Sequence, residues 1–395
     1  MNEKAESILV YCWGSVCEAG VLHALKKLQI PFMIFDKTMK DYHADAVFAQ
    51  ELICLLKRYP IKAVFSYDYF PLLSMICEIN QLPYISWIYD CPQYTLQSKS
   101  IISNFNYVFC FDKLYCDQIK KLGGRHVYHH LLGTDVEYFC KTISDCSDEK
   151  NKYVHDVSFV GNLYNDEKNR IRNVELSDYT EGFLEGIIQA QLQVYGYNFI
   201  RDTIPDEIVC EVLKKCKLGL GEMYIQDEKS LAADAIAKEV SARERIEVLQ
   251  KLSEHFKVNL YTASKLPDVL KKQDNICHMG TASYGTEMPL IFSGSRININ
   301  ITSKSIESGI PQRVLDILAC GGFCLTNYQQ EVAENFVDGK ELVMYTSLDD
   351  ASEKAEYYLT HETERLEIAG NGQKKIKERF RMEQRVGEML KFLQD

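Results

Sequence analysis

Short apolar runs alternate with stretches of helical spacing through the first third of the chain, and this alternation restricts the fold more than any other feature. Strands that are apolar along their whole length are typical of a parallel sheet covered by helices on both faces. The pattern predicts a Rossmann-like α/β domain over residues 1–150, with the polar stretch 142–152 as its linker. The expected strands are SILVYCW (7–13), PFMIFD (31–36), AVFSY (63–67), PYISWIYD (83–90) and YVFCFD (107–112).

A second α/β domain is expected over residues 151–395. Residues from about 165 to 255 show helical patterns with almost no strand signal, which predicts a helical insertion longer than an ordinary connection. Its clearest helix is expected from Ser230 to His255, with apolar residues on one face and charges on the other. A charged helix after Gly370-Asn371-Gly372 is expected to end the chain. The expected strands are HDVSFVGNLY (155–164), NLYT (259–262), RININI (296–301) and FCLTN (323–327).

Two consecutive Rossmann-like domains predict a ligand in a cleft between the carboxyl ends of both sheets. Periplasmic binding proteins, epimerases and glycosyltransferases share this architecture, so the residues of the site must decide the function.

Composition and charge exclude several classes of protein. The formal net charge is −11 and no basic run occurs, which argues against binding to nucleic acid. The sequence contains no stretch of about 18 apolar residues, so no transmembrane helix is expected. The acidic N-terminus does not resemble a signal peptide, and we therefore expect a cytoplasmic protein. The fourteen cysteines are scattered singly, which predicts free thiols and no zinc site. No DxD pair occurs, so no metal is expected.

The segment 287–330 has the pattern strand, loop, helix, Gly-Gly, strand, and its helix is expected to begin near Pro311. Small residues before a helix N-terminus are typical of an anion site, because free N–H groups and the helix dipole both favour negative charge there. The small residues in question are Ser305, Ser308 and Gly309.

Two charged residues follow in this helix. Arg313, in the first turn, has the forked geometry that suits a diphosphate, and Asp316, one turn further, suits the hydroxyls of a ribose. The alternative is that Arg313 and Asp316 only pair with each other on the helix surface.

Several separated segments together resemble one family. The chain resembles GT-B glycosyltransferases, in particular the CgeB-like (spore-maturation-protein-like) group with a DUF3880-type N-terminal region, over most of its length and in the same order. The segments are YISWIYDCP (84–92), VSFVGNLY (157–164), SARERIEVLQKL (241–252), VNLYT (258–262), SRININITSKSIESGIPQRVLDILACGGFCLTNYQ (295–329) and residues 339–372.

This resemblance implies a GT-B fold, with two Rossmann-like domains facing a cleft. It also implies transfer of a sugar, as in a hexosyltransferase, from a nucleotide-sugar in the C-terminal domain to an acceptor at the N-terminal domain. A UDP-sugar is the expected donor, with no cofactor and no metal. The acceptor is left open between a glycan, a lipid-linked precursor and a protein. At the donor, the resemblance places Gly161 and Asn162 near the phosphates, Gly280 at the nucleobase, Arg313 at the diphosphate and Asp316 at the ribose.

One position departs from the family pattern. Many retaining GT-B enzymes have two glutamates with seven residues between them, and the second aligns with Asp316. The first then falls on Ser308, although Glu307 is adjacent. This departure favours inversion, which needs a base at the acceptor hydroxyl.

Asp90, at the end of an apolar strand, is the expected base, because the carboxyl ends of parallel strands face the ligand. Asp68 is the second candidate but is expected to cap a helix. Structural roles are expected for the other polar and aromatic candidates, namely His129, His130, His278, Trp87 and Tyr89.

Two other functions remain open. One is a nucleotide-sugar epimerase or hydrolase, and the other is a nucleotide-sugar-binding protein without catalysis. The helical insertion is expected to serve either as a platform for an acceptor protein or as the surface of a homodimer.

Overall fold

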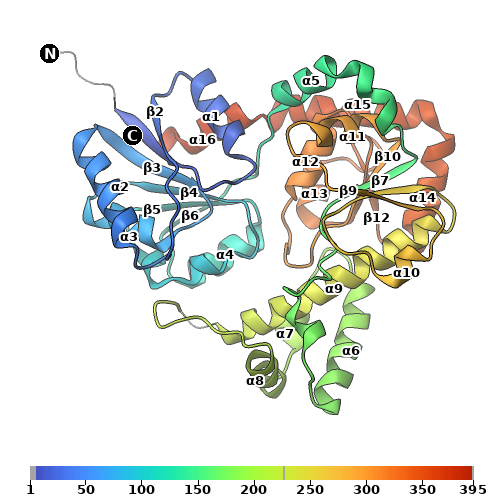
Figure 1. The fold of residues 1–395 in the computed structure, drawn as a ribbon, viewed down its shortest axis with the longest axis horizontal. Coiled ribbons are helices and arrows are strands. Elements are labelled where there is room, and N and C mark those ends of the chain that lie inside the picture. Colours follow the sequence, from blue (N-terminus) through green and yellow to red (C-terminus); the bar gives the residue numbers. More distant parts are fainter. Residues whose placement is uncertain (1–5, 226, 394–395) are drawn as a thin grey trace. The chain divides into compact units, whose positions relative to one another are not determined.

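Two parallel six-stranded sheets, each with its own helices, form the cores of the chain in this computed structural model (Figure 1). The structure describes residues 6–225 and 227–393. The first unit comprises Met1–Gly133, Leu220–Asp227 and Met382–Asp395, and the second comprises Thr134–Gly219 and Glu228–Arg381.

The sheet of the first unit has the strand order β2-β1-β3-β4-β5-β6, in which all pairs are parallel. Helices α2, α3 and α4 cover one face, where their apolar side chains pack on Leu9, Val64, Tyr84 and Val108 (Figure 1). The elements are β1 (Ser7–Tyr11), α1 (Glu18–Lys27), β2 (Phe32–Phe35), α2 (Ala46–Arg58), β3 (Ile61–Tyr67), α3 (Pro71–Ile79), β4 (Tyr84–Ile88), β5 (Asn106–Cys110), α4 (Lys113–Lys121), β6 (His126–His129) and α16 (Met382–Met389).

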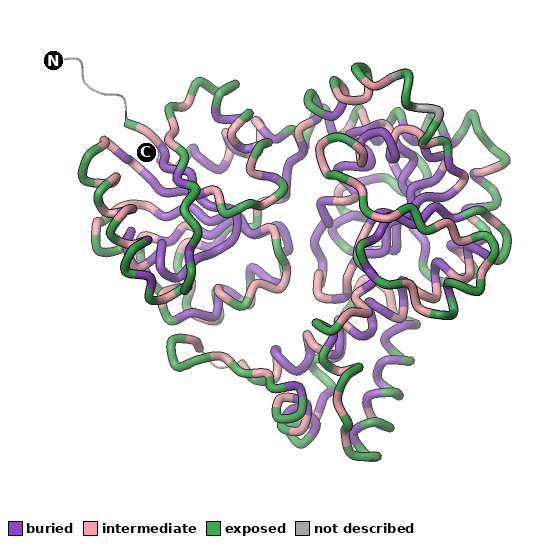
Figure 2. The backbone as a smooth tube through the Cα atoms, in the orientation of Figure 1, coloured by how far each residue is buried: buried purple, intermediate pink, exposed green. Residues whose placement is uncertain are grey.

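The sheet of the second unit has the order β12-β11-β10-β7-β8-β9, again all parallel. Figure 2 shows its strands as the buried centre of the unit. The elements are α5 (Val136–Asp145), β7 (Val157–Val160), α6 (Asp178–Leu192), α7 (Ile200–Thr203), α8 (Asp206–Lys215), α9 (Glu228–Ser253), β8 (Val258–Tyr261), α10 (Asp268–Lys271), β9 (Ile276–Gly280), α11 (Glu287–Gly294), β10 (Ile297–Asn300), α12 (Gln312–Ala319), β11 (Cys324–Asn327), α13 (Gln330–Asn335), β12 (Val343–Tyr345), α14 (Leu348–Thr360) and α15 (Glu362–Arg379).

The helical insertion has a core of its own. Apolar residues of α6, α7 and α8 pack on the first half of α9, while Val248 and Leu249 in its second half belong to the core of the sheet. Because α9 is covered on several sides, the expected division into one apolar and one charged face is wrong. Glu239, Glu244 and Arg245 are all buried.

A segment of the insertion, Leu220–Asp227, belongs to the first unit. The backbone N–H of Lys99 donates to the carbonyl of Met223 (2.9 Å), and the N–H of Ile225 donates to Gln97 (2.6 Å). The chain therefore passes between the two units at Leu220 and Asp227 as well as at Gly133 and Met382.

Three expectations about the organisation of the chain differ from the structure. The division between the units falls after Gly133, and the polar stretch 142–152 is helical rather than a linker, within α5 and a 3₁₀ helix. The helix expected after residue 372 begins at Glu362, and the chain after it, from Met382 on, returns to the first unit. No helix in the described part of the chain has the length and apolar character needed to cross a membrane.

Candidate active site

The residues expected at the donor lie in the second unit, mostly in loops at the carboxyl edge of its sheet. Gly161 and Asn162 follow β7, Gly280 ends β9, and the loop from Ile301 to Pro311 joins β10 to α12. Strands β10, β7, β8 and β9 are neighbours and parallel, so these loops emerge at one edge. This edge is where open parallel sheets bind ligands.

Helix α12 begins at Gln312 after Pro311, as the sequence predicts, and among the described residues no side chain caps it. Two serines of the preceding loop, Ser305 and Ser308, donate to carboxylates. Ser305 Oγ donates to Asp234 Oδ1 and Ser308 Oγ to Glu331 Oε1, each at 2.7 Å. An anion at this helix end would therefore be bound chiefly through backbone N–H groups, which the helix dipole favours.

Arg313 and Asp316 have different environments, so the alternative of a simple pair on the helix surface is not what the structure contains. Arg313 is half-buried, and its guanidinium lies beside Met288 Sδ (3.0 Å) and 5.3 Å from the centre of the Phe292 ring. Asp316 is 1% exposed and accepts hydrogen bonds from Thr134 Oγ1 (2.9 Å) and Gln312 Nε2 (2.7 Å).

Burial raises the pKa of Asp316, although the charge of Arg313 and hydrogen bonds from Gln312, Thr134 and Tyr284 oppose this. Ribose binding by Asp316 would require this network to open. The role stays a prediction.

Gly161 and Gly280 each have a structural reason to be glycine. A Cβ on Gly161 would lie 3.1 Å from the Phe159 ring, and Gly280 has a φ of +79°, in the left-handed region. Asn162 is exposed, and its Oδ1 accepts from Ser264 Oγ (3.1 Å).

Arg245, which no sequence pattern singled out, connects two of these loops. It is 8% exposed, donates to the carbonyl of Asn162, and donates to the carbonyl of Ile301 at 2.7 Å. Its guanidinium also stacks on the ring of Tyr164, 4.3 Å from the centre. Its neighbours on the same helix face, Ala242, Val248 and Leu249, are apolar, and this was the available signal.

Helix α9 also holds the loop between β10 and α12. Lys304 N donates to Ser241 Oγ (2.8 Å), and Lys304 Nζ forms an ion pair with Glu244 Oε1 (3.2 Å). Both members of this ion pair are buried, at 7% and 1% exposure. The loop that leads to α12 is thus positioned by the insertion's longest helix.

Asp90 and Asp68 follow the neighbouring strands β4 and β3 of the first unit. Asp68 Oδ1 accepts hydrogen bonds from the backbone N–H groups of Tyr89 (2.9 Å) and Asp90 (3.0 Å). Asp68 is buried with a φ of +60°, whereas Asp90 is exposed. The expectation that Asp68 caps α3 is wrong, because Phe70 is the N-cap and no side chain in the described part of the chain caps that helix. Asp68 instead holds the turn that carries Asp90.

Both carboxyl groups have raised pKa values. Burial and the charge of Asp90 raise the pKa of Asp68 to about 7, and the two backbone hydrogen bonds oppose this rise. Partial desolvation raises the pKa of Asp90. A carboxylate with a raised pKa is a better base at neutral pH.

Replacing Asp68 with asparagine is expected to change the pH dependence of stability. The pKa of Asp68 is about 7 in the folded state and about 3.9 in an unfolded chain, so only the folded state keeps the proton between these values. The stabilisation that this proton gives the folded state is complete below about pH 4 and is lost as pH rises through about 7. The free energy of unfolding then falls by at most about 1.4 kcal/mol per pH unit. Asparagine keeps the acceptor for both N–H groups and cannot ionise. Melting temperatures of both proteins should therefore diverge in favour of the variant as pH rises over this range. Parallel curves would contradict the assignment.

The remaining candidates have structural surroundings. His130 Nε2 lies 3.0 Å from the carbonyl of Arg385, and burial lowers the pKa of His130 to about 4. Trp87 is fully buried, and His278 Nε2 lies 3.1 Å from the carbonyl of Thr262. Tyr89 contributes its backbone N–H to Asp68, and His129 ends β6.

Neither a disulfide nor a metal cluster is present among residues 6–225 and 227–393. All fourteen cysteines lie in this part of the chain and form no disulfide there. Within it, no three His, Cys, Asp or Glu side chains are grouped so that they could hold a metal ion.

Solved structures with the same arrangement of two parallel sheets are GT-B glycosyltransferases, and the fold of this chain is GT-B. Residues 243–391, less than half of the chain, match the glycosyl transferase-like family. No curated protein matches the sequence.

Three solved structures illustrate the likeness. Alr3699/HepE from Anabaena, in complex with UDP and glucose, has a TM-score of 0.54 at 12% identity, over 98% of this chain and 99% of that one. A glycosyltransferase from Rickettsia africae has a TM-score of 0.56 at 12% identity, over 99% of this chain and 98% of that one. Sucrose-phosphate synthase from Thermosynechococcus elongatus has a TM-score of 0.57 at 8% identity, over 98% of each chain.

Proposed function

We propose that this protein is a metal-independent glycosyltransferase that moves a hexosyl group from a UDP-sugar to an acceptor bound by the first unit. The observation that carries the proposal is the start of α12 at the carboxyl edge of the second sheet. There the N-terminus of α12, to which no side chain among residues 6–225 and 227–393 provides a cap, and the guanidinium of Arg313 lie within the segment that matches the glycosyl transferase-like family. The resemblance to the CgeB-like group supports the same function.

The chemistry follows from these groups. The leaving UDP carries a diphosphate, and the helix dipole, backbone N–H groups and Arg313 would stabilise its charge in place of a metal ion. Asp90, in the first unit, is the proposed base that takes the proton of the acceptor hydroxyl in an inverting reaction. HepE, of similar fold, has been solved with UDP and glucose, which supports UDP as the nucleotide.

An Arg313→Ala variant is expected to bind UDP about ten- to hundredfold more weakly, because it loses charge-assisted hydrogen bonds worth about 1.5–3 kcal/mol. Calorimetry of UDP binding, with EDTA present throughout, measures the change. Arg296→Ala is the matched control, since Arg296 pairs with Asp156 at the amino end of β10 and should leave UDP affinity unchanged.

Several outcomes would contradict the proposal. Equal UDP affinity in both variants would remove Arg313 from the donor site, and binding that requires added manganese would contradict metal independence. Release of free sugar or an epimer from UDP-glucose without any acceptor would indicate a hydrolase or epimerase instead. UDP-sugar binding without turnover across a broad acceptor panel would indicate a binding protein.

A further inference from the structure

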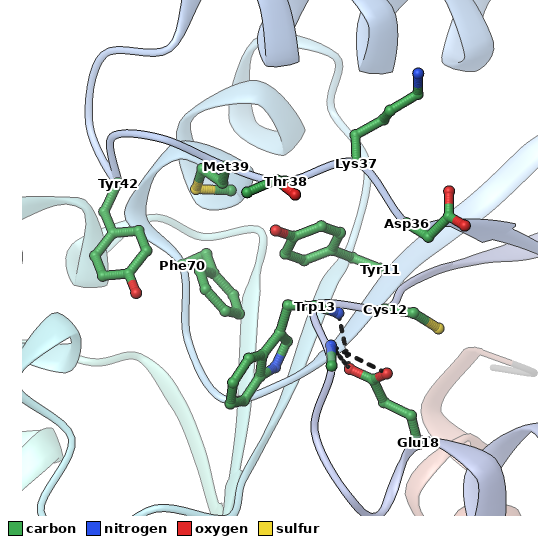
Figure 3. A pocket seen from close by; sticks show the side chains of 11 residues that line it. Tyr11, Cys12, Trp13, Glu18, Asp36, Lys37, Thr38, Met39, Tyr42 and Phe70 are labelled. Atoms are coloured by element: carbon green, nitrogen blue, oxygen red, sulfur yellow. Dashed lines mark hydrogen bonds between the residues drawn. The ribbon is translucent and has the colours of Figure 1, made fainter.

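A pocket of about 450 Å³ lies in the first unit, where β1 and β2 end (Figure 3). It is lined by the residues that follow β1, by the loop after β2, and by Phe70 before α3. Strands β1 and β2 are neighbours in the sheet and parallel, so their loops meet at its carboxyl edge. None of the donor or catalytic residues discussed above lines this pocket.

Aromatic rings form much of the pocket wall. Trp13 and Tyr42 are two of the large hydrophobic side chains that stay exposed, at 40% and 46%. Both rings pack edge-on against Phe70, with centroids 6.0 Å and 5.6 Å away, and Phe70 itself rests on the buried Tyr11 (5.2 Å). Figure 3 shows these four side chains gathered on one side of the pocket.

Trp13 is held in place before any ligand arrives. Its backbone N–H donates to Glu18 Oε1 (2.8 Å), as do the N–H groups of Gly14 and Ser15 (both 3.0 Å). Its indole N–H donates to the carbonyl of Tyr67 (3.0 Å). The polar group of Trp13 is therefore used internally, and the exposed part of the ring is a preorganised apolar surface, which lowers the entropic cost of binding.

The charges of the pocket disfavour an anionic ligand. Glu18 and Asp36 contribute two carboxylates, and the only lysine of the lining, Lys37, forms an ion pair with Glu51 (3.3 Å). In Figure 3 the Lys37 ammonium points away from the aromatic rings. A phosphate or diphosphate would meet net negative charge here, whereas the exposed Asp36 carboxylate can accept hydrogen bonds from hydroxyl groups.

We propose that this pocket binds a neutral sugar, the terminal residue of a glycan acceptor. A sugar ring has an apolar C–H face and a rim of hydroxyls, and its C–H groups, slightly positive, suit the negative face of an aromatic ring. Trp13 and Tyr42 offer such rings, and Asp36 offers an acceptor for the rim. The inference rests on the proposed function in calling this sugar the acceptor, and it decides among glycan, lipid-linked and protein acceptors.

The chain provides its own reporter for a test. It contains two tryptophans, of which Trp87 is fully buried, so solvent-sensitive fluorescence comes from Trp13. The full chain would be titrated, without nucleotide, with methyl glycosides of glucose, galactose, mannose and N-acetylglucosamine, and with maltose and cellobiose. A saturable blue shift together with protection from acrylamide quenching is the expected result for at least one sugar. Decyl phosphate, which represents a lipid-linked acceptor, should give none.

A variant of the pocket makes the test specific. Tyr42→Ala keeps the Trp13 reporter and should weaken sugar binding about three- to tenfold. Tyr128→Ala is the matched control, because Tyr128 is similarly exposed (42%) but lies on β6, at the other edge of the sheet. No saturable response to any sugar, a response to decyl phosphate alone, or unchanged affinity in Tyr42→Ala would overturn the proposal. UDP titration separates the two claims: UDP binding without sugar binding rejects only this pocket, and the reverse rejects only the donor site.

Discussion

Replacing Asp90 with asparagine is expected to lower the rate of sugar transfer by about 10²–10⁴-fold, the usual contribution of a positioned general base. The amide cannot take the proton of the acceptor hydroxyl, but it has the size and hydrogen-bonding reach of the carboxyl group. Asp90 lies in the first unit and the donor residues lie in the second, so the affinity for UDP should stay within about twofold. Turnover under saturating donor and calorimetric UDP binding together measure both parts of the expectation.

Asp68→Asn is the matched control, since Asp68 follows the adjacent strand and its Oδ1 holds the backbone of Tyr89 and Asp90. Asparagine retains that acceptor, so turnover should fall far less than in Asp90→Asn. The anomeric configuration of the product is needed beside these rates. Inversion requires a base, whereas retention would leave Asp90 only a role in acceptor binding. An active Asp90→Asn enzyme would remove the assignment.

These two aspartates illustrate what the sequence could and could not predict. The apolar runs predicted parallel strands β3 and β4, and hence that Asp68 and Asp90 lie at a carboxyl edge. The relation between them depends on the backbone of one turn reaching the side chain of another, with Asp68 in a left-handed conformation. Local residue preferences favour a helix cap for Asp68 and contain no information on that long-range contact.

In the second unit, too, local features could be predicted from the sequence and long-range contacts could not. Pro311 correctly predicted the start of α12, because the signal is local. Strand β12, with three residues, is too short to produce a periodic pattern, and it was not predicted. The charged face expected for α9 does not exist, and its charged residues Arg245 and Glu244 are buried, since a helix covered on several sides has no single apolar face to detect. The contacts that give these charges their role join α9 to loops far away in the sequence.

The buried ion pair between Lys304 and Glu244 gives the largest expected effect on stability. Lys304→Met keeps most of the side-chain volume but leaves the Glu244 carboxylate, 1% exposed, without its cation. Neither oxygen of Glu244 has a hydrogen bond among the described residues, so no hydrogen bond there compensates the lost charge. Removing one member of a buried pair typically costs about 3–5 kcal/mol, and we expect a loss of this size in thermal or urea unfolding of the second unit.

Two further variants decide whether the loss comes from an uncompensated charge. Lys304→Met/Glu244→Gln removes both charges and should recover much of the stability, because the penalty belongs to the lone buried carboxylate. Lys251→Met is the matched control on the same helix: Lys251 pairs with the exposed Asp349 at 3.0 Å, and such surface pairs contribute about 0–1 kcal/mol. A single variant that unfolds like the control, or a double variant less stable than the single one, would show that Lys304 does not act through this pair. UDP affinity of the folded single variant then reports whether the loop before α12 depends on its anchor to α9.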